Sequence, residues 1–145
     1  MIKPHEALQN SISFARDYNL QIPILLSPMA GVCPVSLSAA VANAGGMGSC
    51  GALLMTPEQI SSWVKEMRES SNGTFQLNTW IPDPKPIRNL KNENSIKKLI
   101  AKWEPEISNL PDNLPSQDFE LQCEAMLKAN PPIISSIMGL YPSQF

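Results

Sequence analysis

Short apolar runs alternate with amphipathic stretches along this sequence, and that alternation restricts the chain to few folds. Four runs are typical of buried strands, and they begin at Pro23, Met47, Thr74 and Ile133. The stretches between them repeat apolar residues at the spacing of one helical face. Strands that alternate with helices favour a parallel sheet covered by helices. We therefore expect an α/β fold.

The first run, Pro23 to Met29, is almost continuously apolar, which is typical of a parallel strand buried on both faces. A helix is expected to begin at Pro34, because a proline at the first helical position loses no hydrogen bond. Gly45 and Gly46 end that helix. Met47 to Cys50 is the second strand candidate. The expected apolar face of the helix consists of Leu37, Ala40, Val41 and Ala44.

The clearest helix start is Thr56-Pro57-Glu58-Gln59, where a glutamine follows a threonine cap by three residues. The third strand is expected over Thr74 to Trp80, in which polar and apolar residues alternate. The buried face of the helix between them is expected to consist of Ile60, Trp63, Val64 and Met67.

A proline-rich, polar stretch at about 82–115 interrupts the alternation, and we interpret it as an insertion within the domain. Inside it, Leu90 to Trp103 is a basic amphipathic stretch whose lysines are expected to face solvent. Ser116 is then expected to cap a helix. The fourth strand is expected over Ile133 to Met138, with Gly139 at its end. The apolar side of the preceding helix is expected to hold Phe119, Cys123, Met126 and Leu127.

Composition excludes several classes of partner. The formal net charge is −2 and no basic run stands out, so nucleic acid is not an expected partner. No apolar stretch is long enough to span a membrane, and the N-terminal residues do not resemble a signal peptide. The three cysteines are odd in number and widely spaced, which indicates free thiols in a reducing cytosol. We expect a cytoplasmic protein without a metal site.

The chemistry expected at the strand ends is that of a bound cofactor. Ligands of parallel α/β proteins bind where the strands end. The residues there are small or carry amides, and His5 is the one histidine of the chain, so a nucleophile–histidine triad is not expected. Backbone N–H groups and neutral side chains suit a cofactor that supplies the reactive chemistry itself.

Four segments in chain order resemble the N-terminal region of nitronate monooxygenases, a family of flavin enzymes. Pro23 to Gly31 is similar to the family's P-I-x-x-x-P-M-A-G strand, and Ala39 to Gly48 is similar to its A-A-x-x-N-A-G-G-x-G helix end. Phe75 to Asn78 resembles a strand that ends in asparagine. Pro131 to Pro142 resembles the next barrel strand, where a V-S-x-x-x-G-x-P pattern is usual.

This resemblance implies a (β/α)8 barrel that binds FMN. It assigns Pro28, Met29 and Ala30 to the lining of the flavin ring and Asn78 to a hydrogen bond with the cofactor, for which a neutral amide is suited. Met29 is alternatively a core methionine, and Asn78 a capping residue. Ser135 and Gly139 are candidates for the substrate pocket, although small residues also fit the interior layers of a barrel.

The implied activity is oxidation of an alkyl nitronate with dioxygen to a carbonyl compound and nitrite. The family's catalytic histidine lies on a later strand, so no catalytic residue is assigned here. A (β/α)8 barrel typically needs about 250 residues. Residues 1–145 are therefore expected to form an incomplete FMN-binding TIM-barrel domain, roughly its N-terminal half with about four βα units.

Two alternatives remain open from the sequence. A flavin-dependent enoyl-acyl-carrier-protein reductase shares the same P-M-A-G strand. The chain is otherwise a non-catalytic remnant, or a half-barrel that pairs with another polypeptide. In an incomplete barrel the first and fourth strands have unpaired edges, so we also expect self-association through them.

Overall fold

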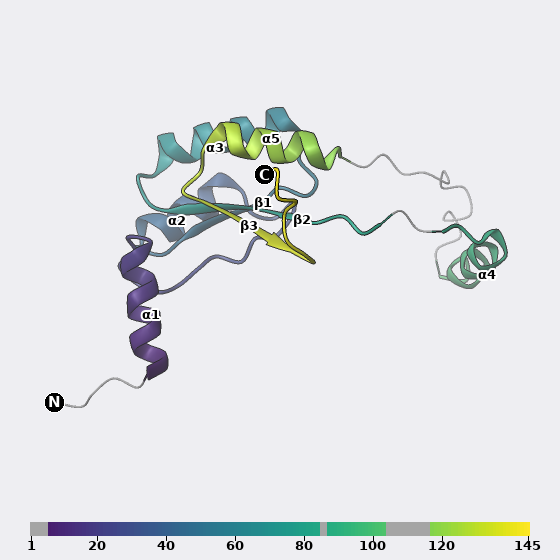
Figure 1. Cartoon of the computed structure of the whole chain (residues 1–145), viewed down its shortest axis with the longest axis horizontal. Coiled ribbons are helices and arrows are strands. Elements are labelled where there is room, and N and C mark those ends of the chain that lie inside the picture. The colour runs from purple at the N-terminus through teal and green to yellow at the C-terminus, as the bar shows by residue number, and fades with distance from the viewer. Residues whose placement is uncertain (1–5, 85–86, 104–116) are drawn as a thin grey trace. The chain divides into compact units, whose positions relative to one another are not determined.

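The computed structural model describes residues 6–84, 87–103 and 117–145 (Figure 1). It divides into two compact units, one formed by residues 1–81 with 117–145 and the other by residues 82–116. Of the elements in the described residues, the first unit contains the sheet and every helix but one. Within the described part of the chain, no helix is long and apolar enough to cross a lipid bilayer.

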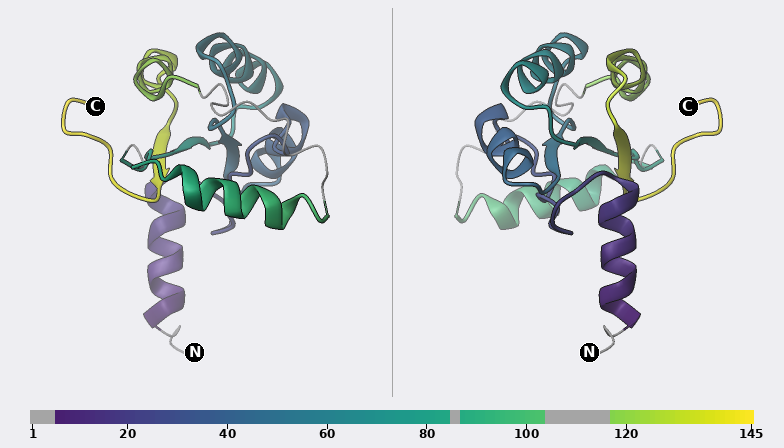
Figure 2. Two further views of the ribbon diagram at one scale, coloured as in Figure 1. Left: turned by 90° about the vertical axis from the view of Figure 1, so that its right-hand side faces the viewer. Right: turned by 90° about the vertical axis from the view of Figure 1, so that its left-hand side faces the viewer.

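A parallel sheet of three strands forms the centre of the first unit. Its order is β1 (Gly48–Gly51), β2 (Phe75–Trp80) and β3 (Ile133–Ile137). Both neighbouring pairs are parallel. Figure 2 shows three helices on one side of this sheet: α2 (Val35–Asn43), α3 (Pro57–Ser70) and α5 (Phe119–Ala129). The predicted α/β fold and the second, third and fourth predicted strands are confirmed.

The first predicted strand is wrong in its extent. It joins β1 only through two isolated parallel bridges, from Leu25 to Met47 and from Ala30 to Gly51. The two bridges are five residues apart on the first segment (25 to 30) but only four apart on the partner (47 to 51). The first segment therefore has one extra residue between the bridges, which disrupts the ladder. Pro28 also lacks an N–H to donate. The segment is not buried on both faces, since Leu25 is 43% exposed.

The core lies between the sheet and the three helices. The capping box that begins α3 is present, because Thr56 accepts from Gln59 N and the Gln59 side chain accepts from Thr56 N. All four apolar positions predicted for this helix are buried. The core cluster joins them to the sheet and to α5, and includes Cys50, Phe75, Leu77, Ala125 and Met126.

The predicted face of α2 is wrong. Leu37 is 38% exposed, whereas the buried positions are Val35, Ser38, Ala39 and Ala42. Apolar residues occupy most of this helix, so their spacing alone does not select a face. The decisive contact is polar: Ser38 Oγ donates to the Ser49 carbonyl over 2.6 Å and accepts from Ser49 N over 3.3 Å. A small residue is required for that approach.

Three further differences concern the helices α5 and α1. The cap of α5 is Asp118, whose carboxylate accepts from Glu120 N and Leu121 N, and not Ser116, which lies outside the described residues. In α5, Cys123 and Met126 are buried as predicted, but Leu127 is 49% exposed. Helix α1 (Glu6–Asp17) is an additional element that the sequence analysis did not predict.

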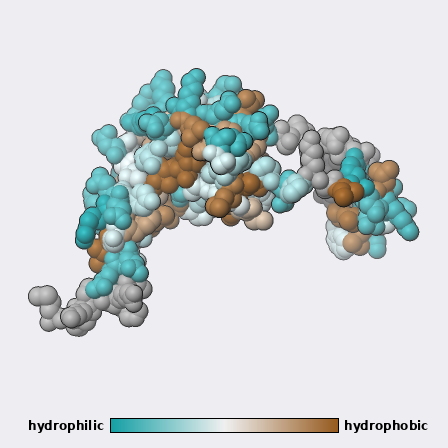
Figure 3. Space-filling view, in the orientation of Figure 1, coloured by the Kyte–Doolittle hydropathy of each residue, from teal (hydrophilic) through white to brown (hydrophobic). Residues whose placement is uncertain are grey.

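Helix α4 (Leu90–Ile100) belongs to the second unit. It ends before Trp103, the last residue of the predicted amphipathic stretch. None of its residues is buried, and Arg88 pairs with Glu93 at its start. Apolar atoms of this helix lie at the surface in Figure 3. The described residues of this stretch belong to a compact unit of their own, while the interpretation of about 82–115 as an insertion within the domain stays a prediction.

Candidate functional site

One row of residues crosses all the parallel segments near their carboxyl ends. Ala30 bridges Gly51, Gly51 pairs with Asn78, and Asn78 pairs with Ser135. We call these four residues the strand-end layer. Register alone therefore brings together three predicted site residues, Ala30, Asn78 and Ser135, from segments that are far apart in sequence.

The side chain of Asn78 lies on the face of the sheet opposite the helices. Phe75 and Leu77 belong to the core cluster, and successive strand residues alternate between faces. Asn78 is only 8% exposed, and its Nδ2 donates to Ser135 Oγ over 2.9 Å. Ser135 Oγ donates in turn to Gln76 Oε1 over 2.8 Å. This network holds the asparagine amide in one orientation without any charged partner.

Gly51 lies where the backbones of two segments approach closely. A Cβ on this residue would lie 2.6 Å from Ala30 N and 2.8 Å from the Met29 carbonyl carbon. No side chain fits there without moving the backbone of the neighbouring segment. The sequence alone did not assign Gly51 to the site, because only its bridge to Ala30 shows what it faces.

The loop after the first segment is held from two sides. Met29 N donates to Cys33 Sγ, and the thiol donates to the Ser27 carbonyl over 3.3 Å. Trp63 Nε1, from α3, donates to the Cys33 carbonyl over 3.1 Å. Gly31 adopts a positive φ of 77° within this turn. The loop therefore presents Met29, which is 38% exposed, beside the strand-end layer.

Pro28 and Ala30 are partly buried in this loop, on either side of Met29. Gly139, by contrast, is not part of the strand-end layer. It lies beyond the end of β3, next to Ile81, and Ser136 Oγ donates to its carbonyl over 2.7 Å. Gly139 thus belongs to the turn that ends β3.

Charge plays little part in this site. The strand-end layer consists of neutral residues. Next to it along β1, burial raises the pKa of Cys50 to about 12, and the neighbouring Cys33 adds to this effect. The Cys50 thiol therefore stays protonated at neutral pH and is a poor nucleophile. Among the residues that the structure describes, no three His, Cys, Asp or Glu side chains gather as metal ligands would. His5 lies outside those residues.

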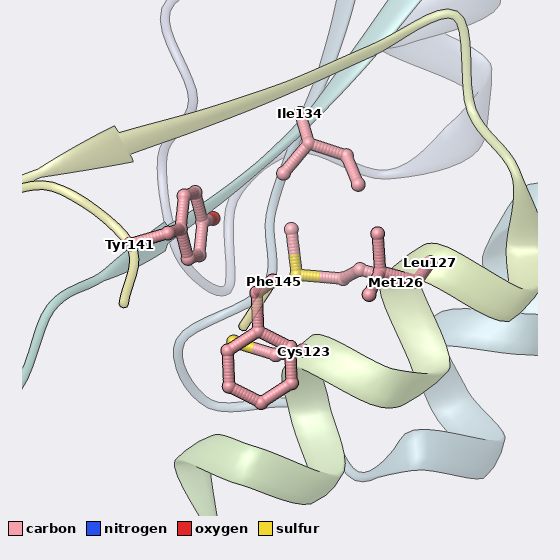
Figure 4. Close-up of a pocket in the computed structure, with 6 residues that line it drawn as sticks. All are labelled: Cys123, Met126, Leu127, Ile134, Tyr141 and Phe145. Carbon is pink, nitrogen blue, oxygen red and sulfur yellow. The ribbon is translucent and has the colours of Figure 1, made fainter. Parts of the chain in front are cut away.

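A separate apolar cavity of about 240 Å³ lies on the helix side of the sheet (Figure 4). Tyr141 closes one side of it, and its hydroxyl donates to the Ser135 carbonyl over 2.8 Å. Burial raises the pKa of Tyr141 to about 12. The lining comes from α5, β3 and the C-terminal residues: Cys123, Met126, Leu127, Ile134, Tyr141 and Phe145.

Comparison with known proteins decides the family. The model of the nitronate monooxygenase family matches residues 13–145, which is most of the chain. The chain belongs to the nitronate monooxygenase family. Flavin dependence is a property of this family. The strand-end layer is neutral and combines an oriented amide with a residue, Gly51, that has no side chain.

Among curated relatives, a probable nitronate monooxygenase of Bacillus subtilis (strain 168) is 33% identical over 95 residues, which cover 65% of this chain and 25% of the relative. A second, from Staphylococcus aureus (strain JH9), is 22% identical over 128 residues, covering 84% and 35%. This chain thus spans only a quarter to about a third of the length of these relatives.

A solved structure supports the fold. The crystal structure described as a nitroalkane oxidase from Streptomyces ansochromogenes superposes with a TM-score of 0.73 at 23% identity. The match covers 91% of this chain and 38% of that protein. The parallel architecture described above is therefore that of part of a family TIM barrel.

Proposed function

We propose that this chain supplies the strand ends that hold the flavin ring of an FMN-dependent nitronate monooxygenase. The observation that carries the proposal is the strand-end layer, in which Ala30, Gly51, Asn78 and Ser135 stand side by side. Ligands of parallel barrels bind at this end of the strands. The family assignment supports a flavin as the ligand.

Each residue of the site has a distinct role in this proposal. The Asn78 amide, held by Ser135, hydrogen-bonds the polar edge of the ring, because an amide both donates and accepts without charge. Gly51 leaves the space beside the loop backbone open. Pro28, Met29 and Ala30 supply the apolar contacts that line the ring.

The proposed reaction is oxidation of an alkyl nitronate with dioxygen to a carbonyl compound and nitrite. The bound flavin supplies the redox chemistry. A nitronate is already the deprotonated form of a nitroalkane, so its oxidation does not require a base to remove a proton from carbon. A site of neutral groups such as Asn78 and Ser135 is consistent with this substrate.

FMN titration of the chain tests the proposal. We expect Asn78→Ala to weaken FMN binding about tenfold, because loss of one hydrogen bond in a buried site costs on the order of 1.5 kcal/mol. The flavin absorbance band and the quenching of flavin fluorescence measure the affinity. Asn94→Ala, at an exposed position of α4, is the matched control and is expected to bind FMN as the parent chain does.

Three outcomes would contradict the proposal or part of it. Absence of FMN binding by the parent chain would favour the alternative of a non-catalytic remnant. Oxidation of NAD(P)H with an enoyl thioester, without turnover of nitronates, would favour a flavin-dependent enoyl-acyl-carrier-protein reductase. Equal FMN affinities of the parent and the Asn78→Ala variant would remove Asn78 from the site.

A further inference from the structure

A second row of side chains lies just beyond the strand-end layer. Trp80 pairs with Ile137, two residues after the pair formed by Asn78 and Ser135. Since side chains two residues apart share a face of the sheet, Trp80 and Ile137 lie on the same face as the candidate flavin site. They also lie nearer to the carboxyl ends of the strands, where a substrate would enter.

These two side chains are large, apolar and open. Trp80 is 48% exposed and Ile137 is 47% exposed, whereas Asn78 beneath them is 8% exposed. Exposed apolar surface next to a polar layer is typical of ligand sites, in which a few polar groups orient a ligand and apolar walls bury the rest of it. We name the pair Trp80 and Ile137 the apolar wall.

Backbone contacts hold the apolar wall in place. Ile81 N donates to the Ile137 carbonyl over 3.0 Å, which extends the pairing of β2 with β3 past Trp80. After Ile137 the chain turns sharply, with Met138 at a φ of 66°. Ser136 Oγ fixes this turn through the Gly139 carbonyl. A non-glycine residue at positive φ persists only where its surroundings impose it, so this strand end is preorganised.

We infer that the apolar wall binds the hydrocarbon part of the substrate and selects nitronates that carry alkyl chains of several carbons. The inference rests on the proposed function, because it takes the strand-end layer as the place where the charged head of the substrate meets the flavin. The planar two-oxygen head of a nitronate would face the polar strand-end layer. Its apolar tail would face the apolar wall, which lies beyond that layer.

Binding of linear alkyl carboxylates tests the inference. From propanoate to octanoate these anions share the planar two-oxygen head of a nitronate but are not oxidised by the flavin. Isothermal titration calorimetry of the full chain, with and without FMN, gives their affinities. We expect affinity to rise about two- to fourfold per methylene, the upper value being that of a fully buried CH₂.

Two variants and their controls locate the effect. Trp80→Ala and Ile137→Ala are expected to flatten the chain-length series, with at least a fivefold loss for octanoate and little change for propanoate. Trp103→Ala and Ile96→Ala remove the same kinds of side chain from exposed positions of the second unit. Phe145→Ala opens the cavity of Figure 4. These three controls are expected to keep the parent series.

The outcomes separate this inference from the proposed function. If Trp80→Ala weakens the dependence of carboxylate affinity on chain length both with and without FMN, the apolar wall is supported. This holds even if FMN itself does not bind and the proposed function fails. A chain that binds FMN but shows no dependence on alkyl length overturns the inference alone. An unchanged series in Trp80→Ala, or an equal loss in Trp103→Ala, also overturns it.

Discussion

At the scale of single residues, the bridge between the first segment and β1 requires a glycine at position 51, which has no side chain. Gly51→Ala would place a Cβ within 3 Å of backbone atoms of Met29 and Ala30, which cannot rotate away. We expect a loss of about 2 kcal/mol in the free energy of unfolding, typical of overpacking, together with weaker FMN binding. Urea denaturation measures the first effect.

Gly31→Ala is the matched comparison for this prediction. Gly31 has open space around its Cβ position but a φ of 77°, so the substitution carries only the conformational cost, about 1 kcal/mol. A larger loss for Gly31→Ala than for Gly51→Ala would show that steric contact at the bridge is not what requires glycine.

Single residues of the site were predictable to different degrees. The resemblance marked Asn78 and Ala30, and the structure places both in the strand-end layer. Gln122 was missed, although its Nε2 donates to the carbonyls of Ala52, Leu53 and Met55 and so holds the loop that follows β1. A polar residue on an apolar helix face gives no sign of which distant carbonyls it meets, because its partners lie about 70 residues away.

At the scale of elements, the start of α3 is stabilised locally. Thr56→Ala removes the acceptor for Gln59 N and breaks the reciprocal capping pair. We expect a loss of about 1 kcal/mol in stability, measured by urea denaturation. Ser62→Ala, at an exposed position of the same helix, is expected to change stability by less than about 0.5 kcal/mol. Equal losses in the two variants would contradict a capping role.

The C-terminal segment is expected to detach at alkaline pH. Burial raises the pKa of Tyr141 from its ordinary 10 to about 12 in the folded chain. The contribution of its protonated hydroxyl to stability is therefore complete below pH 10 and is lost as the pH rises from 10 to 12. Thermal denaturation across this range measures the loss. The Tyr141→Phe variant lacks this hydroxyl, so its stability should not fall in this way between pH 10 and pH 12. An equal loss of stability in Tyr141→Phe would refute the assignment.

Elements were predicted best where the signal is local. The capping box and the turn residues placed α3 and β2 correctly, because a cap is a property of neighbouring residues. The face of α2 depended on Ser38 meeting β1, and the irregular first segment depended on the extra residue opposite β1. Both are properties of two segments at once, so hydrophobic spacing along one segment could not reveal them.

At the scale of the whole molecule, β3 is the outer strand of the sheet. The Ile137 carbonyl bonds to β2, so in a parallel ladder the peptide groups of Ser136 point the other way. We expect the chain to self-associate through this edge, as light scattering coupled to size-exclusion chromatography would show. Ser136→Pro removes the outward N–H and is expected to shift the chain toward monomer.

Ser136→Ala is the control for self-association, because it loses the same hydroxyl contact with Gly139 but keeps the N–H. A concentration-independent monomer in the parent chain would disprove edge pairing.

The parallel α/β class and the family were both accessible from the sequence, since four motifs occur in the right order. Composition also set apart the proline-rich stretch at about 82–115, but only contacts between residues show that it belongs to a compact unit of its own.

The separation between β2 and β3 has a consequence for how this protein can vary. Asn78 and Ser135 are paired although they lie 57 positions apart in the sequence, and the second unit lies within that interval. The entropy lost on closing a loop grows only with the logarithm of its length, so doubling the loop costs about 0.6 kcal/mol. Lengthening or shortening residues 82–116 is thus thermodynamically cheap. Variants with a longer or shorter stretch here are therefore expected to keep the pairing of β2 with β3.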